Sequence, residues 1–297
     1  MEKTGGRTLQ KLLVLPILLI ALTSSGAGAF ALGTKVSAGT EEYRLEREGQ
    51  QIYGKLFLPE EADAPLPLVI LSHGLGSDHR IMEPYAESFA ENGFAAFVFD
   101  YIGGSEESMS DGSMTEMSVL TEAEDLACVL EHFRSDARFS RDEIFLFGGS
   151  QGGFISAYAA GSFPDEIAGL VLLYPAFNLQ EICRGLVSDA GGIPERAVIG
   201  EHTVGSIYLR DMLGFDIYEV LQRYPGPVLL FHGTEDPYVP PAYTERAARV
   251  LADARTVILE GAGHGFLGKD RERVERESAA FLQSIVSEAG SAGRAAA

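Results

Sequence analysis

Short runs of apolar residues, many of them β-branched or aromatic, alternate with longer amphipathic stretches over most of the chain. Several runs are almost continuously hydrophobic, which is typical of strands buried on both faces of a parallel sheet. The expected strands are Gln51–Leu58, Leu66–Leu71, Ala95–Asp100, Glu143–Phe147, Gly169–Tyr174, Pro227–Phe231 and Thr256–Leu259. The expected helices are Ile81–Asn92, Met117–Arg134, Gly152–Gly161, Ala242–Ala254 and Arg271–Ala289. This alternation predicts an α/β fold with a doubly wound, mostly parallel sheet and an antiparallel edge at its first strand.

One interval, residues 177–225, interrupts the alternation because no stretch in it resembles a core strand. An insertion of about 50 residues is too long for a plain loop in a compact domain. Because α/β sheets bind ligands at the carboxyl ends of their strands, we expect this interval to form a cap over that edge. The cap divides the expected core into residues 36–176 and 226–289, and a flexible tail is expected at residues 290–297.

The N-terminal residues have the pattern of a secretory signal peptide. Lys3, Arg7 and Lys11 precede the apolar run Leu12–Leu22, and an A-x-A sequence follows at residues 27–29. A positive region, a short apolar region and such a cleavage site are typical of a leader. The apolar run is only about half as long as a spanning helix needs to be. We therefore expect residues 1–29 to be removed and the protein to be secreted or to lie in the cell envelope or periplasm, without stable membrane insertion. An uncleaved anchor is the alternative.

Composition narrows the range of partners. The 297 residues include 43 acidic and 23 basic side chains, which gives a formal net charge of −20. Such a charge argues against nucleic acids and anionic membrane surfaces as binding partners, because both are bound by positively charged protein surfaces. The two cysteines, Cys128 and Cys183, cannot define a disulfide scaffold, and whether they pair is left open. The oligomeric state is also left open.

Candidate chemistry begins at the G-x-S-x-G sequence of residues 148–152, which follows a predicted strand and precedes a predicted helix. In this context the pattern is a nucleophile elbow, whose glycines allow the tight turn that exposes the hydroxyl of Ser150. Gln151 opens the following helix, so its N–H and the positive end of the helix face a developing oxyanion.

Two further turns provide partners for Ser150. Asp236 lies after a later strand and can orient an imidazole, with the neighbouring Glu235 as the competing acid. His264 lies between glycines directly after the last predicted strand and can serve as a general base. The order serine, aspartate, histidine matches the order of this catalytic triad in α/β sheets with a nucleophile elbow.

A fourth turn, at residues 73–77, follows the strand Leu66–Leu71. We expect it to supply the second oxyanion-hole N–H from Leu75, and we expect His73 to fix the loop by hydrogen bonding. His79 and His132 are expected at surface positions.

These motifs resemble the α/β-hydrolase family, and within it the bacterial cinnamoyl/feruloyl esterases and their serine-aminopeptidase-like relatives. The similar segments are HGLGS at 73–77, VFDY at 98–101, GSQGG at 149–153, HGTEDPYVP at 232–240 and GAGHGF at 261–266. The cap sequence from Gly205 to Val220 is similar as well. The chain departs from these relatives at Gly149, where histidine is common, and in the segment after Asp100.

The resemblance implies a serine carboxylesterase that acts on small esters, hydroxycinnamate esters in particular, with no metal or organic cofactor. It also implies that Tyr208 in the cap contacts the phenolic ring of the substrate. A short-chain acylesterase or monoacylglycerol-type lipase is the alternative, since aliphatic cap residues could line an acyl channel. A serine peptidase with Glu181 or Glu201 as the amine-binding acid, and a catalytically silent binding protein, are further alternatives.

Overall fold

The computed structural model describes residues 39–60, 65–187 and 192–296. The expected signal peptide, residues 1–29, lies outside the described residues. None of the helices in the described ranges is both long and apolar enough to cross a membrane. Cys128 and Cys183 are both free thiols, so the pairing that the sequence left open is not formed.

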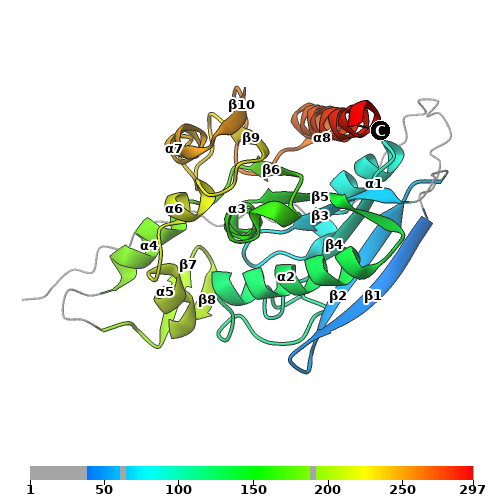
Figure 1. Ribbon diagram of the computed structural model, residues 1–297. Coiled ribbons are helices and arrows are strands. Elements are labelled where there is room, and N and C mark those ends of the chain that lie inside the picture. Colours follow the sequence, from blue (N-terminus) through cyan, green and yellow to red (C-terminus); the bar gives the residue numbers. More distant parts are fainter. Residues whose placement is uncertain (1–38, 61–64, 188–191, 297) are drawn as a thin grey trace, which may run out of the picture.

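An eight-stranded sheet forms the centre of the protein, and helices lie on both of its faces (Figure 1). β2 pairs antiparallel with β1 and β4, and all other neighbours are parallel. The predicted doubly wound, mostly parallel sheet is therefore confirmed. In spatial order the strands are β1 (Gly39–Arg47), β2 (Gln50–Leu58), β4 (Ala95–Phe99), β3 (Leu66–Ser72), β5 (Phe139–Gly149), β6 (Gly169–Leu173), β9 (Pro227–Gly233) and β10 (Asp253–Leu259).

The antiparallel edge differs from the sequence prediction. The edge strand is β1, and the strand predicted for the edge, β2, is the second one in the sheet. β1 has the sequence GTEEYRLER, and Leu45 is its only buried residue. β1 is hydrogen-bonded to β2 along one edge, and its other edge faces solvent. It therefore needs few apolar residues and shows little hydrophobic periodicity.

Two hydrophobic clusters fill the spaces between the sheet and its helices. On one face, α1 (Glu83–Glu91) and α8 (Gly268–Ala296) bury apolar residues against the sheet. On the other face, α2 (Val119–Ser135), α3 (Gln151–Ser162) and α7 (Ala242–Val250) do the same. Helix α8 extends over residues 290–296, where the sequence predicted a flexible tail.

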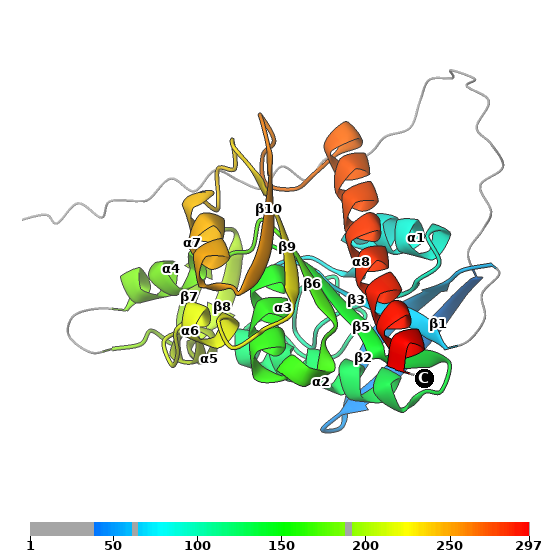
Figure 2. The ribbon, with the colours of Figure 1, turned by 45° about the horizontal axis from the view of Figure 1, so that its top comes forward.

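The segment between β6 and β9 forms the predicted insertion, and its elements gather at one end of the sheet (Figure 2). The insertion contains a small antiparallel pair of strands that is separate from the main sheet and that the sequence did not predict. Each of these strands has only four residues, which is too short for a period-two pattern to be recognised. The elements are α4 (Leu179–Leu186), β7 (Arg196–Ile199), β8 (His202–Gly205), α5 (Ser206–Met212) and α6 (Ile217–Leu221).

Candidate active site

The candidate nucleophile, Ser150, lies in a sharp turn between the end of β5 and the start of α3. Its φ of 55° and ψ of −120° form a backbone conformation that non-glycine residues rarely adopt. Neighbouring backbone holds the turn, because the Ser150 N–H donates to the carbonyl of Leu173 and its carbonyl accepts from Ala176. The strained backbone projects the side chain away from the sheet, as the elbow motif predicted.

Glycines flank Ser150 because there is no room for a Cβ. A Cβ on Gly148 would lie 2.3 Å from the carbonyl oxygen of Gly152. A Cβ on Gly152 would lie 2.2 Å from the carbonyl oxygen of Ser72, at the end of β3. The first turn of α3 therefore packs directly on the loop that follows β3, which brings two of the predicted motifs into contact.

His264 lies between Ser150 and Asp236. Its Nε2 is 3.0 Å from Ser150 Oγ, and its Nδ1 is 2.7 Å from Asp236 Oδ2. A carboxylate at Nδ1 favours the tautomer in which Nδ1 carries the proton and Nε2 can accept one. Glu235, the competing acid in the sequence, is exposed. The structure thus brings together the three side chains that the sequence proposed from distant turns.

The carboxylate of Asp236 is fully buried and fixed by several donors. The backbone N–H groups of Tyr238 and Val239 both donate to its Oδ1 at 2.9 Å. Burial alone would raise the pKa of Asp236, but hydrogen bonds from His232 and His264 hold it well below its usual range. Asp236 therefore stays ionised and can stabilise an imidazolium at His264.

Two tyrosines that the sequence analysis did not single out enclose the ring of His264. The ring of Tyr174 lies 4.4 Å away between centroids, and that of Tyr238 lies 5.4 Å away. Tyr174 has a φ of 36°, in the left-handed region. A Cβ on Gly149 would lie 3.1 Å from Met82 Cε and 3.4 Å from the Tyr174 hydroxyl, so residue 149 lies directly beside this tyrosine. The only signal in the sequence is the place of Tyr174 at the carboxyl end of β6.

The loop after β3 lies against Ser150. A Cβ on Gly74 would lie 3.2 Å from Ser150 Cβ, which places the neighbouring Leu75 backbone beside the nucleophile. His73 bonds the carbonyl of Gly74 through Nδ1 at 2.9 Å and accepts from the N–H of Tyr101 through Nε2. Burial lowers the pKa of His73, so the ring is neutral and holds the loop by hydrogen bonds. This is the position that the sequence predicted for His73.

Tyr208 is the cap residue to which the resemblance assigned a contact with the phenolic ring of the substrate. It is completely buried, and its hydroxyl donates to Gln151 Oε1 at 2.5 Å. Gln151 in turn donates from Nε2 to Glu122 Oε2 at 2.6 Å. In this structure Tyr208 therefore packs against the residue that follows the nucleophile, and its side chain has no contact with solvent.

His79 is buried, so its predicted surface position is wrong. Its Nδ1 lies 2.8 Å from Oδ1 of the fully buried Asp100, which needs a partner at that depth. With Asp78, these residues form the one group in the described ranges that has metal-ligand geometry. The guanidinium of Arg80 donates hydrogen bonds to both carboxylate oxygens of Asp78. The backbone N–H groups of His79 and Met109 donate to the carboxylate of Asp100. Donors from the protein therefore already bind the carboxylate oxygens of Asp78 and Asp100. This arrangement is more typical of buried ion pairs than of a metal-binding site.

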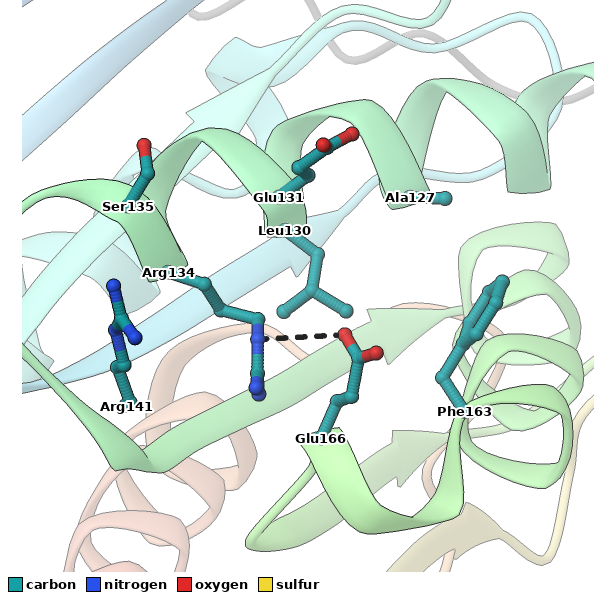
Figure 3. Close-up of a pocket in the computed structure, with 8 residues that line it drawn as sticks. All are labelled: Ala127, Leu130, Glu131, Arg134, Ser135, Arg141, Phe163 and Glu166. Atoms are coloured by element: carbon teal, nitrogen blue, oxygen red, sulfur yellow. Dashed lines mark ion pairs between the residues drawn. The ribbon is translucent and has the colours of Figure 1, made fainter.

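A surface pocket of about 420 Å³ lies elsewhere, between α2, the start of β5 and the 3₁₀ turn Pro164–Glu166 (Figure 3). An ion pair of 3.5 Å between Arg134 and Glu166 crosses it. Its lining contains none of the residues around Ser150, so it is separate from the candidate active site.

Comparisons with known proteins agree with this architecture. A serine aminopeptidase (S33) family model matches residues 63–200, and a TAP-like protein family model matches residues 217–290. The solved structure of Est1E from Butyrivibrio proteoclasticus with ferulic acid bound superposes with a TM-score of 0.76 at 23% identity. It covers 82% of this chain and 99% of Est1E. The chain has the α/β-hydrolase fold.

Curated relatives of this α/β hydrolase are distant. The uncharacterized protein YfhR of Escherichia coli K12 is 24% identical over 217 residues, which cover 72% of this chain and 68% of YfhR. The acetyl esterase Axe7A of Xylanibacter ruminicola is 27% identical over 212 residues, which cover 64% of this chain and 47% of Axe7A. The likeness to Axe7A supports hydrolase chemistry and leaves the substrate to be argued from the site.

Proposed function

We propose that the protein is a serine carboxylesterase in which Ser150 is the nucleophile, His264 the general base and Asp236 the residue that orients His264. The observation that carries this proposal is the continuous chain of contacts from Ser150 Oγ through His264 to the buried Asp236 carboxylate. An activated serine of this kind performs acyl transfer through a covalent intermediate.

The reaction proceeds in two halves. Ser150 Oγ bonds to the ester carbonyl carbon while its proton passes to His264 Nε2. The tetrahedral intermediate expels the alcohol, which takes that proton, and an acyl-serine remains. Water then adds to the acyl carbon with His264 again as base, and collapse of the second intermediate releases the acid and restores the Ser150 hydroxyl.

The negative charge that develops on the carbonyl oxygen needs fixed donors. We assign this role to the backbone N–H groups of Leu75 and Gln151, which lie on the two segments packed together at the nucleophile. Gln151 is the first residue of α3, where backbone N–H groups have no partner within the helix. One such donor contributes about 3 kcal/mol to the stability of the transition state.

For the substrate, we propose small esters with an aromatic acid such as a hydroxycinnamate. The fold similarity to Est1E, whose solved structure holds ferulic acid, supports this class. The acetyl esterase relative supports the alternative of short acyl esters.

Replacing the nucleophile tests the reaction. Ser150→Ala should lower the turnover of p-nitrophenyl acetate by about 10⁴-fold or more, because no attacking oxygen remains. It should also abolish labelling by a fluorophosphonate probe, which reacts only with an activated serine. Ser162→Ala, the same change at an exposed position at the other end of α3, is the control. Near-normal turnover or labelling in Ser150→Ala would overturn the proposal.

A pair of methyl esters tests the substrate class with the leaving group held constant. Methyl ferulate should show a kcat/KM about tenfold or more above that of methyl butyrate, because an aromatic acid buries more apolar surface. Turnover of the butyrate without the ferulate would assign the enzyme to the short-chain acylesterases.

A further inference from the structure

A continuous chain of buried hydrogen bonds joins the cap to the nucleophile elbow. Tyr208 on the cap helix α5 donates to the side chain of Gln151 at the start of α3. Gln151 donates onward to Glu122 on α2. Three elements that are distant in the sequence therefore meet at one glutamine, the residue that follows the nucleophile.

All three side chains are removed from solvent. Tyr208 has 0%, Gln151 1% and Glu122 1% of its surface exposed. Water cannot replace a partner at this depth, so Gln151 depends on both neighbours for its side-chain hydrogen bonds, and Tyr208 and Glu122 each depend on Gln151. Both ends of the Gln151 amide are occupied, and its orientation follows the positions of α2 and α5.

A second set of contacts holds the cap helix in the same place. The hydroxyl of Ser118, which caps α2, donates to Asp211 on α5 at 2.5 Å. Just before α5, a Cβ on Gly205 would lie 1.9 Å from the carbonyl oxygen of Thr115, so the two backbones are in direct contact. Helix α5 is thus fixed beside the N-terminus of α2, which keeps Tyr208 within reach of Gln151.

Glu122 suits this arrangement as an uncharged acid. Burial raises its pKa well above the usual range, and the hydrogen bond from Gln151 only partly opposes this effect. A neutral carboxylic acid needs no counter-ion, and it still offers Gln151 Nε2 an acceptor oxygen.

From this geometry we infer that Tyr208 and Glu122 are positioning residues that hold Gln151 with its backbone N–H directed at the developing oxyanion. Docking of the cap then becomes a condition of efficient catalysis, and Tyr208 acts on the transition state rather than on the phenolic ring of a substrate. The inference rests on the proposed esterase function.

The test separates transition-state stabilisation from substrate binding. Tyr208→Phe keeps the ring and removes the hydroxyl that donates to Gln151. We expect kcat to fall about tenfold for methyl ferulate and methyl butyrate alike, with KM within about twofold, because only the oxyanion contact is impaired. The Ki of a trifluoromethyl ketone, which forms an oxyanion on the enzyme, should rise by the same factor.

Matched variants control for a general effect on folding. Tyr224→Phe also removes the hydroxyl of a fully buried tyrosine, which donates to the carbonyl of Ile167, and it should leave kcat unchanged. Glu122→Gln keeps an acceptor oxygen and should retain activity, whereas Glu122→Leu should match the loss in Tyr208→Phe. Thermal unfolding shows which variants fold, and the pair Tyr208→Phe and Glu122→Gln remains informative if Glu122→Leu does not.

The outcomes are distinct. A rise in KM confined to methyl ferulate would overturn the inference and make Tyr208 a substrate contact. The inference would also be overturned if kcat and Ki were unchanged in Tyr208→Phe, or if Tyr224→Phe changed them as much as Tyr208→Phe does. In either case an active wild-type protein would still support the esterase proposal. A wild-type protein without Ser150-dependent turnover would overturn both.

Discussion

At the residue scale, backbone strain is concentrated around the candidate base. Three non-glycine residues in the described ranges have a positive φ, and two of them, Ser150 and Tyr174, contact His264. Such conformations cost about 1–3 kcal/mol each and persist only where the surroundings enforce them. The elbow motif predicted the strain at Ser150. No local pattern predicts the conformation of Tyr174, whose N–H donates to the carbonyl of Phe231, a residue of a strand that follows the cap.

The buried pair of His79 and Asp100 predicts a dependence of stability on pH. Although burial opposes both shifts, their mutual hydrogen bond raises the pKa of His79 and lowers that of Asp100. The lowered pKa of Asp100 stabilises the fold above about pH 3.9, and this contribution is lost as the pH falls. The raised pKa of His79 stabilises it below about pH 6.5, and this contribution is lost as the pH rises.

Asp100→Asn should therefore destabilise the protein by about 3 kcal/mol at pH 5.5, because it removes one partner of a buried ion pair. The difference from the wild type should shrink as the pH rises to 9, because deprotonation of His79 removes the positive charge that pairs with Asp100. Urea unfolding at the two pH values measures it, with Asp142→Asn at an exposed site as the control. An equal difference at both pH values would show that the pair is not charged.

At the scale of elements, the sequence predicted those strands and helices that have a clear hydrophobic pattern. The central strands are continuous apolar runs, and their positions are confirmed to within a few residues. The exposed edge strand β1 and the four-residue strands β7 and β8 have no such pattern and were missed. The candidate site was predictable where chemistry coincides with a local turn, as at Ser150. Glu122 was missed because its contact with Gln151 joins two helices and leaves no local pattern.

At the scale of the whole molecule, the topology explains why the distant motifs meet. Ser150 follows β5, Asp236 follows β9 and His264 follows β10, and the carboxyl ends of these parallel strands share one edge of the sheet. The sequence order of the motifs therefore becomes a spatial cluster without any local contact among them.

We also propose that the protein is exported. Expressed in full in a bacterial host, it should be recovered outside the cytoplasm with an N-terminus that follows Ala29 or Ala31, because the leader has the features of a cleaved signal peptide. Mass spectrometry of the product checks this. Leu18→Arg places a charge in the apolar region and should block export. An intact chain that remains in the membrane fraction would show that the segment is an uncleaved anchor.

The insertion leaves the sheet after β6 and returns at β9, and these two strands are direct neighbours. A segment whose two ends lie so near each other can change in length or be exchanged between homologues while the scaffold beneath it stays intact. One contact nevertheless limits such exchanges. Any insertion that replaces the present one must place a hydroxyl where that of Tyr208 now donates to Gln151. Substrate specificity can thus change during evolution through the insertion, provided that each new insertion keeps the hydrogen bond to Gln151.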